Sequence, residues 1–301
     1  MFAGLVVNKE NLGIVFTAFK TAFMNHFRDT ATYWEQIATR VPSTSKSEKY
    51  GWIGQFPRLR KWLGDRQVKS LALHDYTIVN EKYEGTIGIS RDDIDDDSYG
   101  MLTPVFSDMG YAAATHPDEL VFDLLARGFT ELCYDGQFFF DTDHPVGNED
   151  TGIVSVANMQ AGVEAPWFLL DTRRPLKPLI FQVRRDYDLK SKTDPNSENV
   201  WNRDEFEFGV DARVSVGFGF WQMAFGSKAT LSQQNFDDNY AAMMALKSDE
   251  GRPLGIMPNV LVCGPSNRAA AKSVIKAQRL ANGASNTNFE AVELLVVPWL
   301  A

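Results

Sequence analysis

The sequence has few of the residues that build metal, redox and disulfide sites. Its 301 residues include 2 cysteines and 4 histidines. Cys133 and Cys263 lie far apart and fit no zinc or redox spacing, so the sequence predicts two free thiols in a reducing compartment. Catalysis needs a convergent set of side chains, and the sequence shows none. We therefore predict that the chain is not an enzyme, with no metal and no cofactor.

An excess of basic residues and long apolar runs are also missing. The chain has 30 Lys and Arg against 39 Asp and Glu, which gives a formal net charge of −9. Proteins that grip nucleic acid usually show a basic patch or stripe. No apolar run approaches the ~20 residues of a membrane span. The N-terminal stretch lacks the basic start and cleavage pattern of a signal peptide. We expect no membrane partner and a chain made and kept in a cytoplasm.

Residues 204–225 carry the strongest local pattern in the chain. Apolar side chains occupy the even positions from Phe206 to Phe220, and mostly polar ones the odd positions from Glu205 to Ser215. This period of two predicts a long strand with one buried face. After Phe220 the apolar set moves to odd positions, so we predict a bulge or a bend at Gly217 and Gly219.

Two segments have helical spacing. Residues 11–27 form an amphipathic pattern whose apolar face includes Phe16, Phe19 and Phe23. This face needs a surface to cover, on the same chain or on a neighbour. Residues 116–134, with the weaker stretch 102–114 before them, predict a long helical spine, either continuous or broken near Pro117. The acidic run 91–97 lacks the glycine and closing glutamate of a calcium loop, so it predicts a solvated turn before a helix.

Other segments predict strands and loops. Residues 68–90 have the pattern of a pair of strands around a turn at 80–82. Residues 166–183 predict two short strands, and 187–202 a polar loop. In the last third we predict a helix capped by Ser232, a buried strand at 259–263, a helix from Ser266 to Gln278 and a terminal strand. Because no regular βαβ alternation occurs, the class is α+β.

The segment 41–67 has no clean periodicity although it is rich in aromatic and basic side chains. It carries Trp52, Phe56 and Trp62 among serines, glycines and basic residues. Trp, Tyr and Arg are enriched at protein interfaces. Composition alone supports equally an interface segment and a long surface loop.

One short stretch permits an enzymatic alternative. Asp141, Asp143 and His144 are metal-ligand types, and would suit a metal-dependent hydrolase. Cys133 together with His144 would suit a thiol nucleophile and its base. Neither set has a supporting spacing such as two histidines at i and i+4, so turn chemistry is the preferred interpretation.

Five stretches of the chain carry distinctive strings: YGWIGQFPRLRKWLGDR (50–66), YEGTIGISRDDIDDDSYGMLTPVF (83–106), HPDELVFDLLARGFTELCYDGQFFFDTDHP (116–145), PWFLLDTRRPLKPLIFQ (166–182) and VGFGFWQMA (216–224). In these stretches the chain closely resembles the Mu-like prophage major head subunit family, and the resemblance runs in order over nearly the whole chain. It implies a Hong Kong 97-type capsid fold, with an N-terminal arm at 1–46 and an extended loop at 47–75. A peripheral domain with a spine helix would span 76–150. An axial domain with returning peripheral strands, including 204–225, would span 151–301.

The same resemblance implies a major capsid protein of a tailed double-stranded DNA bacteriophage. Copies would form hexamers and pentamers that close an icosahedral shell, so the chain's main partner is itself. Two sets of side chains would contact neighbouring subunits: Trp52, Phe56, Arg58, Arg60, Lys61, Trp62 and Arg66 on the extended loop, and Phe16, Phe19 and Phe23 on the arm.

Further partners follow from the resemblance. Because the chain reaches the arm directly after Met1, we expect the scaffold to be a separate protein. A portal protein, with decoration proteins as a further candidate, would join the shell. Packaged DNA would be touched only non-specifically. The chain would occupy the host cytoplasm before and during assembly and the virion afterwards. A tail or decoration protein is the alternative among phage components.

Overall fold

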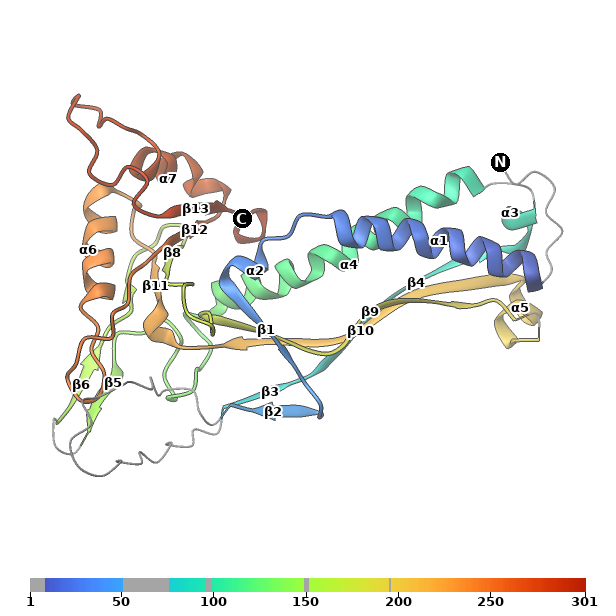
Figure 1. Ribbon diagram of the computed structural model, residues 1–301, viewed down its shortest axis with the longest axis horizontal. Helices are drawn as coiled ribbons and strands as arrows, with labels where there is room; N and C mark the ends of the chain where they lie inside the picture. Colours follow the sequence, from blue (N-terminus) through green and yellow to red (C-terminus); the bar gives the residue numbers. More distant parts are fainter. Residues whose placement is uncertain (1–8, 51–75, 96–98, 149–151, 195) are drawn as a thin grey trace.

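The computed structural model of the chain describes residues 9–50, 76–95, 99–148, 152–194 and 196–301. The molecule is elongated. One end holds a long twisted sheet covered by two helices, and the other a five-stranded sheet with helices beside it (Figure 1). Helices and strands follow one another without βαβ alternation, which confirms the α+β class.

Four strands form the long sheet, in the order β1-β9-β10-β4. Their bounds are β1 (Ala38–Pro42), β9 (Leu179–Lys192), β10 (Glu205–Phe218) and β4 (Glu81–Ser90). β10 is antiparallel to both of its neighbours, whereas β1 and β9 are parallel. The alternation predicted from the sequence sets the buried face of β10: Phe206, Phe208 and Val214 are at most 1% exposed.

The irregularity of β10 lies elsewhere than predicted. Its register against β9 shifts between Asp211 and Val214, so there is no bulge at Gly217. The alternative, a bend, is found at Gly219, directly after β10 ends. The apolar residues move from even to odd positions after Phe220 because β10 has ended. The 3₁₀ turn η1 (Trp221–Met223) then leads into β11 (Ala224–Ser227). Gly217 serves close packing instead, since a Cβ there would lie 2.2 Å from Ile78 Cδ1.

The long helices α1 (Lys9–Asp29) and α4 (Tyr99–Arg127) lie side by side along the long sheet (Figure 1). The short helix α3 (Arg91–Asp95), in the acidic run, precedes α4. The predicted long helix is present, and α4 is continuous through Pro117, which excludes the alternative of a break there. The core packing of its apolar face offsets the proline's cost of ~3 kcal/mol. At Gly110 a Cβ would lie 2.3 Å from the carbonyl oxygen of Phe23, so glycine lets the two helices touch.

The five-stranded sheet has the order β13-β12-β8-β11-β7. Its further strands are β13 (Glu293–Val296), β12 (Val260–Cys263), β8 (Trp167–Leu170) and β7 (Met159–Gln160). α6 (Gln233–Met244) begins as predicted at Ser232, whose hydroxyl accepts from the Asn235 N–H at 3.2 Å. α7 (Arg268–Ile275) is shorter than predicted because the 3₁₀ turn η2 (Pro265–Asn267) precedes it.

Short elements connect these bodies. They are α2 (Trp34–Ile37), α5 (Glu198–Arg203), η3 (Pro298–Leu300), β2 (Ser47–Lys49), β3 (Thr77–Val79), β5 (His144–Asn148) and β6 (Gly152–Val156). The described part of the pair of strands predicted at 68–90 is found as β3 and β4, but the two do not pair with each other: β3 pairs with β2, whereas β4 pairs with β10. The predicted loop 187–202 is wrong at both ends, since residues 187–192 continue β9 opposite β10 and residues 198–202 lie in α5.

Two clusters of buried apolar side chains hold the molecule together. One lies between α1, the first half of α4 and the long sheet, and includes Phe19, Phe106 and Phe208. The larger one lies at the junction of the two sheets and includes Trp167 and Trp221. Within the described ranges, no helix has the length and apolarity to cross a membrane.

Candidate subunit-contact surfaces

The phenylalanines of the predicted arm contact the chain's own body. The Phe19 ring is 2% exposed and stacks on Phe106 of α4, with ring centroids 4.0 Å apart. It also meets Phe208 of β10 edge-on at 5.7 Å. Phe23 is fully buried, while Phe16 is half-buried beside Phe208. In this conformation Phe19 and Phe23 are used inside the subunit, and of the three only Phe16 has surface left for a neighbour.

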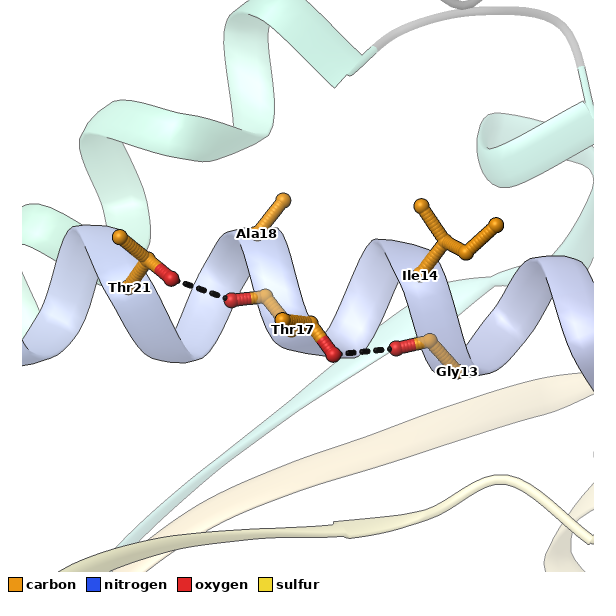
Figure 2. A pocket seen from close by; sticks show the side chains of 5 residues that line it. All are labelled: Gly13, Ile14, Thr17, Ala18 and Thr21. Carbon is orange, nitrogen blue, oxygen red and sulfur yellow. Dashed lines mark hydrogen bonds between the residues drawn. The ribbon is translucent and has the colours of Figure 1, made fainter.

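The opposite face of α1 is exposed and built from small residues. Gly13, Ile14, Thr17, Ala18 and Thr21 line a shallow hollow there (Figure 2). Thr17 and Thr21 donate their hydroxyls to the carbonyls of Gly13 and Thr17, both at 2.7 Å. The two hydroxyls are therefore satisfied within the helix, and what the hollow offers a partner is mainly apolar.

The seven loop residues predicted to contact a neighbour, from Trp52 to Arg66, lie outside the described residues. The described base of this loop is firmly held. Tyr50 donates its hydroxyl to the buried Gln182 side chain at 2.7 Å. The carboxylate of Glu48 accepts from the N–H of Thr44 and the hydroxyl of Ser43, and these bonds lower its pKa to about 2.

The ribbon of β5 and β6 exposes apolar side chains. Ile153 is 72% exposed and Val154 58%, on opposite faces of β6. In the described part of the chain this sheet has two strands, and β6 carries no charged residue. Uncharged, β-branched edge strands are a ready template for pairing with another chain, and native proteins normally cover them. Val163, 98% exposed, follows β7 shortly afterwards.

Large apolar side chains are also exposed on α4 and α5. Met101, Val105 and Tyr111 lie on α4, and all are more than 40% exposed. The other side of the same helix buries Phe106 and Ala113. A helix that is apolar on both sides is normally covered on both. Trp201 on α5 is 81% exposed, and tryptophan is the residue type most enriched in interface hot spots.

The residues of the enzymatic alternative do not form the predicted site. His144 is buried and faces Asp135 at 2.8 Å, while Asp141 accepts hydrogen bonds from the main chain of its own turn, at Phe138 and Thr142. Asp143 is exposed, and its pKa is raised by the hydrogen bond with Asp141. The grouping of Asp141, Asp143 and His144 into a metal site is therefore not found.

The structure instead groups Cys133, Asp135 and His144, with one potential ligand atom of each within 4.8 Å of the others. The thiol donates to Asp135 Oδ1 at 3.1 Å, so a carboxylate stands between thiol and imidazole. Burial, together with the charge of Asp135, raises the pKa of Cys133 well above its ordinary value. A protonated thiol bonded to a carboxylate is a poor nucleophile, which argues against thiol catalysis. The sequence analysis did not single out Asp135. The feature that could have indicated it is the spacing of Cys133 and Asp135, with one residue between them, directly before Gly136.

Solved phage shells resemble this chain over its whole length. The subunit in the procapsid of bacteriophage JBD30 has a TM-score of 0.88 and 45% identity, covering 97% of this chain and all of that one. The subunit in the bacteriophage JBD30 capsid has a TM-score of 0.78 and 37% identity, covering 99% and 100%. The fold is thus the expected Hong Kong 97-type fold of phage capsid subunits, which are structural proteins and not enzymes.

Curated relatives narrow this class to one family. The major capsid protein of Escherichia phage Mu is 37% identical over 98% of this chain and 100% of its own length. The Mu-like prophage FluMu major head subunit of Haemophilus influenzae is 41% identical, with 90% of each chain covered. The family of the Mu-like prophage major head subunit gpT matches residues 12–300. The chain belongs to this family, as the resemblance of its sequence indicated.

Proposed function

We propose that copies of this chain associate as hexamers and pentamers and close an icosahedral shell around double-stranded DNA. The chain is a major capsid protein of a tailed phage, and such proteins self-assemble into the shell of the virion. The observation that carries the proposal is the match of the whole chain, at a TM-score of 0.88, to a subunit of a phage procapsid. Heterologous contacts between identical subunits generate such closed rings and shells.

The exposed apolar surfaces support contacts between copies. β6, with Ile153 and Val154, lies at the opposite end of the elongated subunit from α5, with Trp201, and from the start of α4, with Met101 (Figure 1). Contacts at several separate places are what a subunit with many neighbours needs. The loop residues from Trp52 to Arg66 remain proposed contacts, and on the arm we retain Phe16 and add the exposed face of α1 around Ile14.

The proposed domains follow the two bodies of the fold. The arm would comprise residues 1–46 and the extended loop 47–75. The peripheral domain, at 76–150 with the returning strands, would correspond to α4 and the long sheet. The axial domain within 151–301 would correspond to the five-stranded sheet with α6 and α7.

The described conformation supports an assembly-precursor state. The TM-score to the JBD30 procapsid subunit, 0.88, exceeds that to the JBD30 capsid subunit, 0.78.

A separate scaffold protein, a portal and decoration proteins would complete the particle, and DNA would be contacted non-specifically. Before assembly the chain would reside in the host cytoplasm. The shell of JBD30 has also been seen decorated with minor capsid protein trimers.

Expression with the scaffold protein of the same phage, followed by negative-stain electron microscopy, tests the proposal. Closed shells, or sheets of hexamers in the absence of scaffold, are expected. The double variant Ile153→Lys/Val154→Lys should reduce shell yield, while Ser155→Lys on the same exposed strand is the control for an added charge. Folded small oligomers from the wild-type chain under both conditions would contradict the proposal.

A further inference from the structure

A buried group of polar side chains joins the segment after α4 to the junction of the two sheets. His144 is fully buried, and the Asp135 side chain is 8% exposed. The His144 ring stacks on Trp221 of η1 with ring centroids 3.9 Å apart. Asn158, which directly precedes β7, is also fully buried. The group therefore contacts two connections of the fold: Asn158 lies at the start of β7, and Trp221 lies between β10 and β11.

The orientation of the Asn158 amide is fixed by its surroundings. Its Nδ2 faces three main-chain carbonyls: Phe139 at 2.7 Å, Trp221 at 3.3 Å and Ala224 at 3.3 Å. Its Oδ1 accepts from the N–H of Asp141 at 2.9 Å and faces Nε2 of His144 at 3.2 Å. An amide oxygen has no proton to give, so Nε2 of His144 must be the donor.

The other ring nitrogen also faces an acceptor. Nδ1 of His144 lies 2.8 Å from Asp135 Oδ2. The second oxygen of Asp135 accepts from the thiol of Cys133 and the N–H of Gln137, both at 3.1 Å. Burial works to raise the pKa of Asp135, but the bonds from His144 and Cys133 bring it below its ordinary value. Asp135 is therefore a carboxylate, and Nδ1 must donate as well.

A neutral imidazole carries one N–H, so neither tautomer satisfies both bonds. We propose that His144 is held as a doubly protonated imidazolium, whose bonds to Asp135 and Asn158 form a proton-dependent latch at the junction of the two sheets. Loss of either proton would leave a buried ring nitrogen facing an oxygen with no hydrogen between them. The titratable groups around the ring are Asp135, which faces Nδ1, and Cys133, which contacts the ring only through Asp135. The exposed Asp143 interacts with His144 through its charge.

The latch opens in acid. The pKa of Asp135 is lowered, so its pairing is present above the ordinary carboxyl value and is lost as pH falls through the lowered one. The aromatic face of Trp221 favours the cation over the neutral ring.

Nuclear magnetic resonance of the unassembled subunit, labelled with ¹⁵N-histidine, tests the charge state. At neutral pH, we expect both ring nitrogens of His144 to be protonated. His144→Gln assigns the signal, and if that variant does not fold, single replacements of His26, His74 and His116 assign it by elimination. In Asp135→Asn the introduced amide can donate to Nδ1, so His144 should become neutral with its proton on Nε2. A neutral ring in the wild type overturns the proposal.

Hydrogen exchange tests the latch itself. The amide of Asp141 donates to Asn158 Oδ1, and the amide of Asn158 donates to the Asp141 carbonyl at 3.0 Å. After correction for intrinsic rates, lowering the pH until Asp135 is protonated should lower the protection of these two amides roughly tenfold or more relative to those of β12. If all these amides respond equally, His144 is a buried charge and not a latch.

Discussion

Replacing Phe19 with alanine separates an arm folded on its own subunit from an arm docked on a neighbour. The Phe19 ring is 2% exposed and contacts Phe106 and Phe208. Truncation of a buried phenylalanine costs about 3–5 kcal/mol, because apolar contacts are lost and a cavity remains. At a urea dependence of ~3 kcal/mol per molar, the unfolding midpoint of the unassembled subunit should fall by roughly 1 M or more.

The assay is urea unfolding of unassembled subunits, followed by tryptophan fluorescence and circular dichroism. Ile14→Ala is the matched control: it lies on the same helix, is 49% exposed and should change stability by less than ~1 kcal/mol. If Phe19→Ala unfolds like the control but abolishes shell assembly, the ring serves a neighbouring subunit, and the packing of α1 on α4 described above is refuted.

Three further predictions concern packing, thiols and pH. Gly110→Ala should destabilise the subunit by about 1–3 kcal/mol in the same urea assay, since its Cβ would meet the Phe23 carbonyl, whereas Gly13→Ala, with open space around it, should be neutral or stabilising by up to ~1 kcal/mol. Equal effects of the two changes would contradict the close contact of α1 and α4. Burial raises the pKa of Cys133 and raises that of Cys263 to about 11, so at pH 8 both thiols should react with a thiol reagent far more slowly than in the unfolded chain; comparable rates would show that the thiols are accessible. The pKa of Glu48 is lowered to about 2, so its stabilising bonds are present above about 4.5 and lost as pH falls toward 2. Glu48→Gln should therefore be less stable than the wild type at pH 6, with a difference that shrinks in acid; a difference independent of pH would exclude the carboxylate as its source.

Local periodicity predicted individual elements well because it reports which side of an element is buried. The even positions of β10 and the apolar face of α1 could be found in this way. Periodicity does not reveal which other strand or helix an element pairs with or packs against. The two strands between Thr77 and Ser90 were expected to pair with each other. Instead β4 pairs along its whole length with β10, and β3 pairs with β2. In the same way, the apolar face of α1 could not be assigned to its own chain until α4 was placed beside it.

The buried polar cluster shows a second limit. Asp141 and Asp143 are nearer than Asp135 to His144 in sequence, yet Asp135 binds the imidazole. The chain reverses at Gly136, whose φ of +85° suits glycine, and Phe138 returns to pair with Leu132. Asn158 and Trp221 then arrive from distant segments. Only the fold brings these groups together, whereas the family could be identified from the sequence because its motifs run in order along the chain.

A cryo-electron microscopy reconstruction of the particles formed by the wild-type chain and its scaffold tests the central claim most directly. The account predicts an icosahedral shell of hexamers and pentamers, in which α1 packs on α4 of the same subunit and Ile153 and Val154 of β6 contact another copy. A helical tube, or a shell in which both side chains of β6 face solvent, would contradict it.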